Sequence, residues 1–182
     1  MNVLFSLLHR WVNRPTTPSA ELGPAPSSSA AAEELFLKGQ DVANGKGVAQ
    51  DYAQAVQCYT AAAEQGHSVA QLNLAGLYER GQGIARDEVK ARMWLAKAAN
   101  SGNAAAQYRL GIQEHLACRN DRAASVAEGR IEALKWIRLS AAQGYRGAEG
   151  ACEFVALRMT REEVAEGGRR ASAFLPPPKP AV

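Results

Sequence analysis

The chain has 182 residues, a length typical of one domain, and 47% of them are hydrophobic, which is enough to form a core. The net charge is +3, and the basic residues are spread evenly: residues 33–145 hold 13 Lys or Arg and 12 Asp or Glu. Nucleic-acid binders concentrate basic side chains along one stripe, so this balance argues against a nucleic-acid partner.

Cysteines and histidines are scattered along the sequence without ligand-like pairs: Cys58, Cys118, Cys152, His9, His67 and His115. Disulfide frameworks and zinc sites need such residues at short, paired spacing. We therefore expect free thiols in a reducing compartment, a cytoplasmic protein, no metal and no cofactor.

Residues 1–14, MNVLFSLLHRWVNR, are expected to form an amphipathic helix. Asn2, Ser6, His9 and Asn13 share one face at helical spacing, and apolar side chains cover the other. The apolar run is too short to span a bilayer, and no basic residue precedes it as in a secretory signal. Three roles stay open: a helix that folds back on the chain, an anchor to a membrane surface or partner, and an organelle transit peptide.

Residues 15–30, PTTPSAELGPAPSSSA, contain four prolines and almost no large apolar side chains. Such a segment cannot bury a core, so we expect a disordered linker. Residues 176–182, PPPKPAV, are expected to form a short disordered tail.

Between these segments the sequence repeats itself every 36 residues. The offset joins glycines above all: Gly45 with Gly81, Gly47 with Gly83, and Gly66 with Gly102. A period in this range indicates stacked supersecondary units, none of which can bury its apolar face alone. We expect repeats at 31–67, 68–103 and 104–145.

The middle repeat shows the expected unit most clearly. Its first helix is predicted at about 68–80, with Ser68 and Gln71 spaced as a capping box. Gly81 should stop this helix because glycine adopts left-handed dihedrals without a steric penalty. Asp87 should begin the second helix, where a carboxylate favours the positive end of the helix dipole.

The third repeat departs from this unit. Trp94 and Trp136 are 42 residues apart, as are Gly102 and Gly144, so six residues are inserted. We expect them to form a longer, mobile loop between the two helices of this repeat.

Beyond the third repeat, residues 146–175 are expected to hold a partial repeat and a capping helix. Residues 147–158 resemble another first helix. Thr160 and Glu163 predict a capping box for the last helix, which should end near Phe174 and turn Arg169 and Arg170 towards solvent.

The middle repeat resembles the Sel-1-like repeat family, a relative of the tetratricopeptide solenoids. The match is carried by Ala70, Gln71, Leu74, Tyr78, Gly81, Gly83, Ile84, Asp87, Lys90, Ala91, Trp94, Ala98, Ala99 and Gly102. The resemblance implies an all-α fold, a right-handed α-solenoid of about three to four antiparallel helix pairs with a C-terminal capping helix. It also implies an adaptor or scaffold without catalytic residues.

The residues themselves offer little catalytic chemistry. The Gly-x-Gly turns follow helices, whereas a dinucleotide-binding loop follows a strand. Asp87 and Glu88, like Glu162 and Glu163, stand at helix starts, where acidic residues stabilise the helix. No Ser/His/Asp set converges, so a hydrolase is the least favoured function.

A binding surface remains, because first helices line the inner face of stacked helical pairs. The residues expected to point into that concave face are Leu72, Asn73, Gly76, Glu79, Arg80, Tyr108, Ile112 and His115. Tyr108 and Ile112 could anchor a partner helix or peptide, with Glu79 and Arg80 setting its register. Two alternatives stay open: Tyr108 and Ile112 pack against residues 1–14 or the next repeat, or residues 1–14 occupy the groove themselves.

The sequence thus favours a non-enzymatic module that binds a protein or peptide on its concave face. The alternative is a membrane- or envelope-associated structural or regulatory protein that is tethered by residues 1–14.

Overall fold

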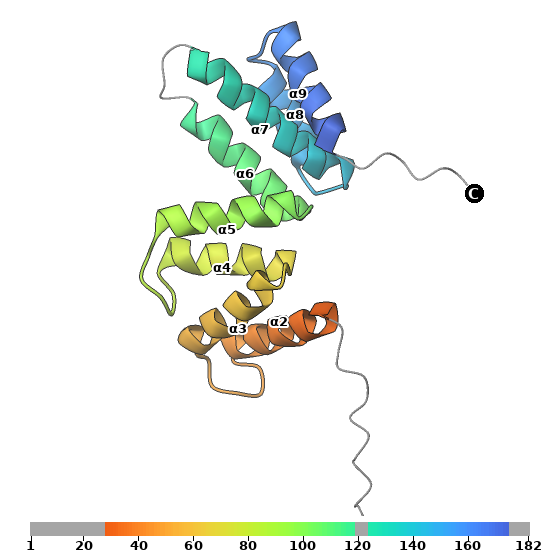
Figure 1. The fold of residues 1–182 in the computed structure, drawn as a ribbon. Coiled ribbons are helices and arrows are strands. Elements are labelled where there is room, and N and C mark those ends of the chain that lie inside the picture. Colours follow the sequence, from red (N-terminus) through yellow and green to blue (C-terminus); the bar gives the residue numbers. More distant parts are fainter. Residues whose placement is uncertain (1–27, 119–123, 175–182) are drawn as a thin grey trace, which may run out of the picture.

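The computed structural model describes residues 28–118 and 124–174, and this part of the chain holds eight α-helices and no strand. They are α2 Ser28–Asn44, α3 Tyr52–Glu64, α4 Ser68–Arg80, α5 Glu88–Asn100, α6 Ala104–Ala117, α7 Ala124–Ala142, α8 Ala148–Ala156 and α9 Arg161–Phe174. They stack in order along the molecule, from α2 and α3 at the bottom of Figure 1 to α8 and α9 at the top. The predicted all-α solenoid is confirmed.

Successive antiparallel pairs form the array: α2 with α3, α4 with α5, and α6 with α7. All seven repeat glycines have positive φ angles, between 65° and 87°: Gly45, Gly47, Gly66, Gly81, Gly83, Gly102 and Gly144. Asp87 caps α5 as predicted, accepting a hydrogen bond of 2.9 Å from the Lys90 backbone N–H. These local signals explain why the bounds of α4 follow the sequence so closely.

Two clusters form the core. The first runs from Phe36 on α2 through Leu74 and Leu95 to Trp136, and it joins all three pairs. The second gathers Leu134 and Ile137 of α7 with Ala148 and Val155 of α8. Trp94 and Trp136, the equivalent tryptophans of two repeats, are both buried.

The capping box predicted at Ser68 and Gln71 is wrong. His67 caps α4 instead, because its Nδ1 accepts a hydrogen bond of 3.1 Å from the Ala70 N–H. The Gln71 side chain is buried and donates from Nε2 to the Ala63 carbonyl at 3.0 Å. Gln107 repeats this bond to the Ala99 carbonyl at 3.1 Å, so in the second and third repeats this glutamine joins the first helix to the helix before it.

The longer loop predicted in the third repeat is also wrong. The chain between α6 and α7 covers 118–123, whereas the one between α4 and α5 covers 81–87. The six inserted residues instead lengthen α7, which has 19 residues where α5 has 13. Residues 119–123 lie outside the described part of the chain. At the other end, α2 begins at Ser28, three residues inside the segment expected to be a linker.

The last helix keeps its predicted capping box. The Glu163 N–H donates to the Thr160 hydroxyl at 3.2 Å, and the Thr160 N–H donates to the Glu163 carboxylate at 2.9 Å. Arg170 does not turn freely to solvent as expected. Its guanidinium reaches Glu132 on α7 at 2.8 Å and also pairs with Glu128, so it ties α9 to α7.

Candidate functional site

A groove opens where equivalent positions of successive first helices meet, and we call it the first-helix groove. Its cavity has a volume of about 380 Å³, within the range typical of ligand pockets. It is lined by Gln40, Ala43, Asn44, Tyr52, Tyr59, Leu72, Asn73, Gly76, Leu77, Arg80, Gln82 and Arg109. Gly76 lets the Arg80 guanidinium lie close to α4, because a Cβ at Gly76 would come within 3.1 Å of it.

The groove is polar and carries positive charge. Arg80 donates from Nε to the Gln82 side chain at 2.6 Å, and Arg109 pairs with Glu79 at 2.5 Å. No Asp or Glu belongs to the lining set, but Glu79 balances Arg109 from the edge, so Arg80 contributes most of the positive charge in the groove.

Tyr59 forms part of the wall. Burial raises the pKa of its phenol, and a hydrogen bond with the Asn73 side chain opposes that rise. The Tyr59 phenol therefore stays neutral, and its hydrogen bond fixes the Asn73 side chain in the wall of the groove.

The structure separates the residues predicted for the binding face into two groups. Leu72, Asn73 and Arg80 line the first-helix groove, as does Gly76. Glu79 lies at its edge, where it holds Arg109 and Gln113 and borders a second cavity.

The other three belong to the C-terminal half. Tyr108 and Ile112 pack against the second core cluster, and the Tyr108 ring lies 5.3 Å from that of Tyr145. His115 is buried and meets the Phe154 ring edge-on at 5.8 Å. For Tyr108 and Ile112 the alternative of packing against the next repeat is the arrangement found.

Several groove residues were missed by the sequence analysis, although the period could have found them. Gln40 and Asn44 lie 36 residues before Gly76 and Arg80, and Arg109 lies 36 residues after Asn73. Moving the predicted residues of the middle repeat by 36 positions, towards either end of the chain, therefore identifies these three residues. Tyr52 and Tyr59 come from α3, a second helix, and have no such signal.

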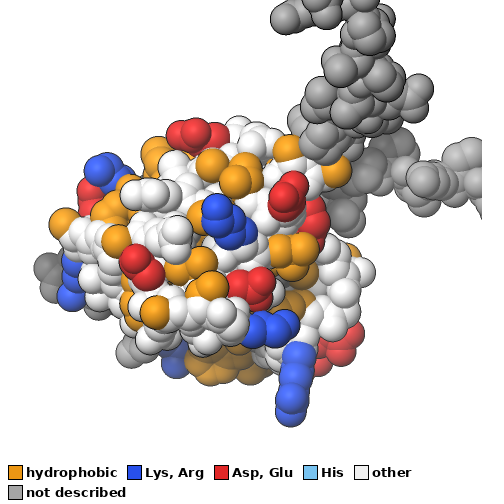
Figure 2. All heavy atoms as spheres, turned by 90° about the horizontal axis from the view of Figure 1, so that it is seen from below, with side chains coloured by type: hydrophobic (Ala, Val, Ile, Leu, Met, Phe, Trp, Pro, Cys, Tyr) orange, Lys and Arg blue, Asp and Glu red, His pale blue; other side chains and the backbone are white. Residues whose placement is uncertain are grey.

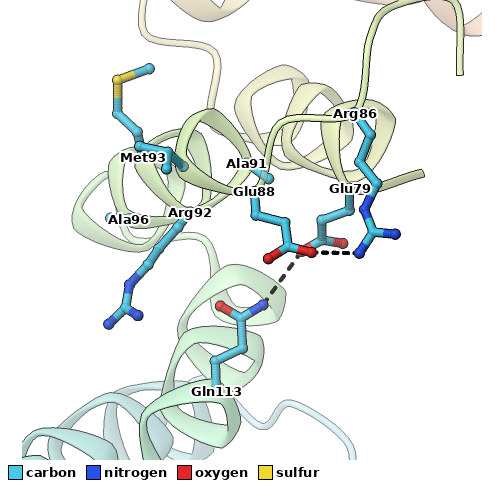
Figure 3. Close-up of a pocket in the computed structure, with 9 residues that line it drawn as sticks. Glu79, Arg86, Glu88, Ala91, Arg92, Met93, Ala96 and Gln113 are labelled. Carbon is cyan, nitrogen blue, oxygen red and sulfur yellow. Dashed lines mark hydrogen bonds and ion pairs between the residues drawn. The ribbon is translucent and has the colours of Figure 1, made fainter. Parts of the chain in front are cut away.

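A second, larger cavity of about 780 Å³ lies between α5 and the end of α6, and we call it the α5 cleft. It is lined by Glu79, Arg86, Glu88, Val89, Ala91, Arg92, Met93, Ala96 and Gln113. In Figure 3, Gln113 reaches from α6 towards Glu79, while Arg86 and Glu88 pair along the rim. Val89, Met93 and Ala96 of α5 are among its apolar lining residues.

Catalytic chemistry finds little support among the described residues. The carboxylate of Asp87 is engaged as a helix cap, and the hydrogen bond from the Lys90 backbone lowers its pKa. No three His, Cys, Asp or Glu side chains of the described segments are placed to share a metal ion. Within the same segments, no helix has the length and apolarity needed to cross a membrane.

Charges on the lower end of the molecule are mixed. Figure 2 shows this end with basic, acidic and apolar side chains interspersed. This face therefore carries no stripe of one sign, in keeping with the even charge distribution of the sequence.

Comparison with known proteins identifies the repeated unit. The Sel1 repeat model matches residues 30–67, 68–103 and 104–145. A Sel1 repeat protein from Oxalobacter formigenes has a similar structure, with 27% identity and a TM-score of 0.63 over 82% of this chain. The chain covers 61% of that protein.

Two further similarities are more distant or shorter. The antigen c5321 of uropathogenic Escherichia coli, with an SLR fold, is 23% identical with a TM-score of 0.46, over 78% of this chain and 38% of its own. The uncharacterized protein NMB1327 of Neisseria meningitidis serogroup B is 49% identical over 47 residues, which are 26% of this chain and 10% of that protein.

Proposed function

We propose a binding function on the premise that the chain belongs to the Sel1 repeat family. Members of this family are generally protein–protein interaction modules and typically non-catalytic scaffolds. The specific proposal is that an acidic peptide segment of a partner protein binds in the first-helix groove. The observation that carries it is the cavity of about 380 Å³ built from equivalent positions of α2, α4 and α6.

The lining chemistry supports an acidic segment in extended conformation. Gln40, Asn44 and Asn73 offer amide groups, which can both donate to and accept from an extended backbone. Arg80 and Arg109 offer guanidinium groups, which bind carboxylates through charge-assisted hydrogen bonds. Because Glu79 already balances Arg109, Arg80 provides the attraction for an acidic ligand and the repulsion for a basic one.

Arg80 is the side chain to test. It is exposed and hydrogen-bonds to Gln82, so its reversal to glutamate should leave the fold intact. Lys38 provides the matched control, since it is an exposed cation on α2 outside the groove lining. Both Arg80→Glu and Lys38→Glu change the net charge by the same amount.

The experiment selects binders to the full chain from a random peptide library displayed on phage. We expect enrichment of acidic peptides, and at least a tenfold loss of affinity in Arg80→Glu by isothermal titration calorimetry. Lys38→Glu should bind the same peptides within about twofold, because the screened surface charge outside the site contributes little. Selected peptides without excess acid, or equal binding by Arg80→Glu, would contradict the proposal.

A further inference from the structure

The α5 cleft presents an apolar stripe to solvent. Val89, Met93 and Ala96 follow one another at i, i+4 and i+7 on α5, so they share one face of the helix. Val89 is 81% exposed and Met93 is 42% exposed. Large apolar side chains gathered in a cavity of this size commonly mark a contact surface.

The repeats themselves show that the solenoid does not require this stripe. One repeat earlier, the equivalent positions on α3 hold Ala53, Gln57 and Thr60. In the third repeat, allowing for the six inserted residues, they hold Ile131, Lys135 and Arg138. Only α5 of these three second helices has apolar side chains at all three positions. The stripe therefore belongs to this face of α5 and not to the repeat fold.

Charges at the rim are already balanced. Arg86 pairs with Glu88, Arg92 pairs with Glu114 on α6, and Glu79 pairs with Arg109. The cleft thus has no large excess of either sign. Its occupant is selected by an apolar surface at helical spacing and not by charge.

We propose that residues 1–14 of the same chain dock in the α5 cleft as an amphipathic helix. The sequence MNVLFSLLHRWVNR places Leu4, Leu8 and Trp11 at i, i+4 and i+7, the same spacing as the stripe on α5. Its polar positions, such as Asn2 and Asn13, would face solvent. Helices with matching apolar stripes bury them against one another.

The intervening chain is long enough. Residues 15–27 number 13 and include four prolines, and a proline-rich segment extends by ~3.1 Å per residue, or about 40 Å in all. Glu33 contacts His67 at 2.8 Å, so the start of α2 lies beside the start of α4.

From that point the distance to the stripe follows from helix geometry. The start of α4 is at the same end as the finish of α5, and Val89 lies at the other end of α5. When Leu4, Leu8 and Trp11 lie against Val89, Met93 and Ala96 in that order, the linker has to reach only Ala96, the nearer end of the stripe. The four residues from Ala96 to Asn100 rise about 6 Å, and the five from Ser28 to Glu33 add about 8 Å. With two helix-to-helix steps of ~10 Å each, the path is roughly 34 Å, which is within the reach of the linker.

Tethering favours this occupant over a second copy or a separate protein. The linker keeps the attached segment near the cleft at any protein concentration. A free partner occupies the cleft in proportion to its own concentration, so the chain's own segment has the advantage at low concentration.

The test is reciprocal and uses the full chain throughout. Leu4→Asp with Leu8→Asp should remove docking from the segment side, and Met93→Glu should remove it from the cleft side. Asn13→Asp is the control on the polar face of the segment. Gln57→Glu is the control at the position of α3 equivalent to Met93.

Hydrogen–deuterium exchange with mass spectrometry provides the readout. We expect residues 88–97 to exchange at least fivefold faster in the Leu4→Asp, Leu8→Asp chain than in the unchanged chain. We also expect residues 1–14 to exchange at least tenfold faster in Met93→Glu, while both control variants match the unchanged chain. This reciprocal loss is what docking within one chain requires.

Other occupants give different results, and each overturns the proposal. Protection that rises with protein concentration would assign the stripe to a second copy. Protection of residues 1–14 that appears only with phosphatidylcholine–phosphatidylglycerol vesicles, and survives Met93→Glu, would assign the segment to a membrane surface. If hydrogen exchange were the same in all variants, residues 1–14 would not bind in the α5 cleft. The outcome is independent of peptide binding in the first-helix groove.

Discussion

Leu72 on α4 and Tyr108 on α6 occupy equivalent positions, 36 residues apart, and they have different surroundings. Leu72 packs against the first core cluster and also borders the first-helix groove, whose lining residues on α2 and α6 are mostly polar. Tyr108 packs against the second core cluster, beside Tyr145. The difference lies in the next element of the array. Another regular pair, α6 and α7, comes after α4 and α5, whereas the shorter α8, with 9 residues, comes after α6 and α7. Whether a residue at this position of a first helix is accessible or covered therefore depends on the helices packed beside it.

Substitutions at equivalent positions of two repeats test this dependence on neighbours. The largest effect is expected at Gly83. Its φ is +70°, and an added Cβ would lie 2.2 Å from the Tyr52 carbonyl carbon, because the α4–α5 turn packs on the start of α3. Gly47, with φ of +73°, has open space around it since no repeat precedes α2 in the described chain.

We expect Gly83→Ala to cost about 3 kcal/mol or more, from backbone strain plus a clash that flexible side chains cannot relieve. Gly47→Ala should cost only about 1 kcal/mol, which is the strain alone. Urea unfolding followed by circular dichroism measures both. Equal losses would show that the contact between repeats contributes nothing.

The next effect concerns the two positions with which the comparison began. Tyr108→Ala should destabilise the chain by about 2 kcal/mol, because it removes a half-buried aromatic side chain with a ring contact. Leu72→Ala should cost about 1 kcal/mol or less, since one side of Leu72 faces the groove. If Tyr108→Ala lowered the free energy of unfolding by less than Leu72→Ala, Tyr108 would again be a candidate for partner binding.

Acid should selectively weaken the contact between α7 and the C-terminal helix α9. Burial acts to raise the pKa of Glu132, but hydrogen bonds from Arg170 and Lys135 outweigh it and hold the pKa below the ordinary value of 4.5. A lowered pKa in the folded state contributes stability that is present above pH 4.5 and is lost as pH falls through the lowered value. The contact between α7 and α9 should therefore loosen as the pH falls below 4.5 and through the lowered pKa.

The variant Arg170→Ala should remove much of this acid sensitivity, since Arg170 bridges Glu132 and Glu128 to α9. Arg169→Ala is the matched control, because Arg169 pairs with Glu166 on its own helix. Hydrogen exchange of residues 161–174 at pH 7 and pH 3, corrected for intrinsic rates, provides the measurement. If α9 were equally acid-sensitive in both variants, the ion pairs of Arg170 would not be the cause of the acid sensitivity.

Local signals in the sequence were enough to predict most of the solenoid. Glycines with positive φ and the Asp87 cap act within one turn of helix, so the period alone located α4 and α5. The insertion in the third repeat was different. The spacing between tryptophans counts residues, but it does not say whether they lengthen a loop or a helix. Here they extend α7.

The groove lining was predicted for the middle repeat alone, although the period also contains the equivalent positions of α2 and α6. Leu72, Asn73 and Arg80 line the groove because α2 and α6 flank α4 in the same register, which the period implies. The covering of Tyr108 and Ile112 depends on how α8 packs on α7. Sequence spacing carries no information on that placement.

The smallest effect concerns His67, whose role as a cap was also missed. Histidine is an uncommon cap, and here partners 31 and 34 residues earlier hold it: the Phe36 ring stacks at 4.5 Å, and the Glu33 carboxylate lies 2.8 Å from Nε2. One repeat later, Asn103 caps α6 alone, and Val69 and Leu72 stand where Glu33 and Phe36 would be. His67→Asn should therefore keep the cap and lose only the link to α2, at about 0.5–1 kcal/mol. His67→Ala should lose about 1 kcal/mol more, because the Ala70 N–H is then left without its acceptor. Thermal unfolding of both variants measures the difference, and equal melting temperatures would mean that water replaces the imidazole at no cost.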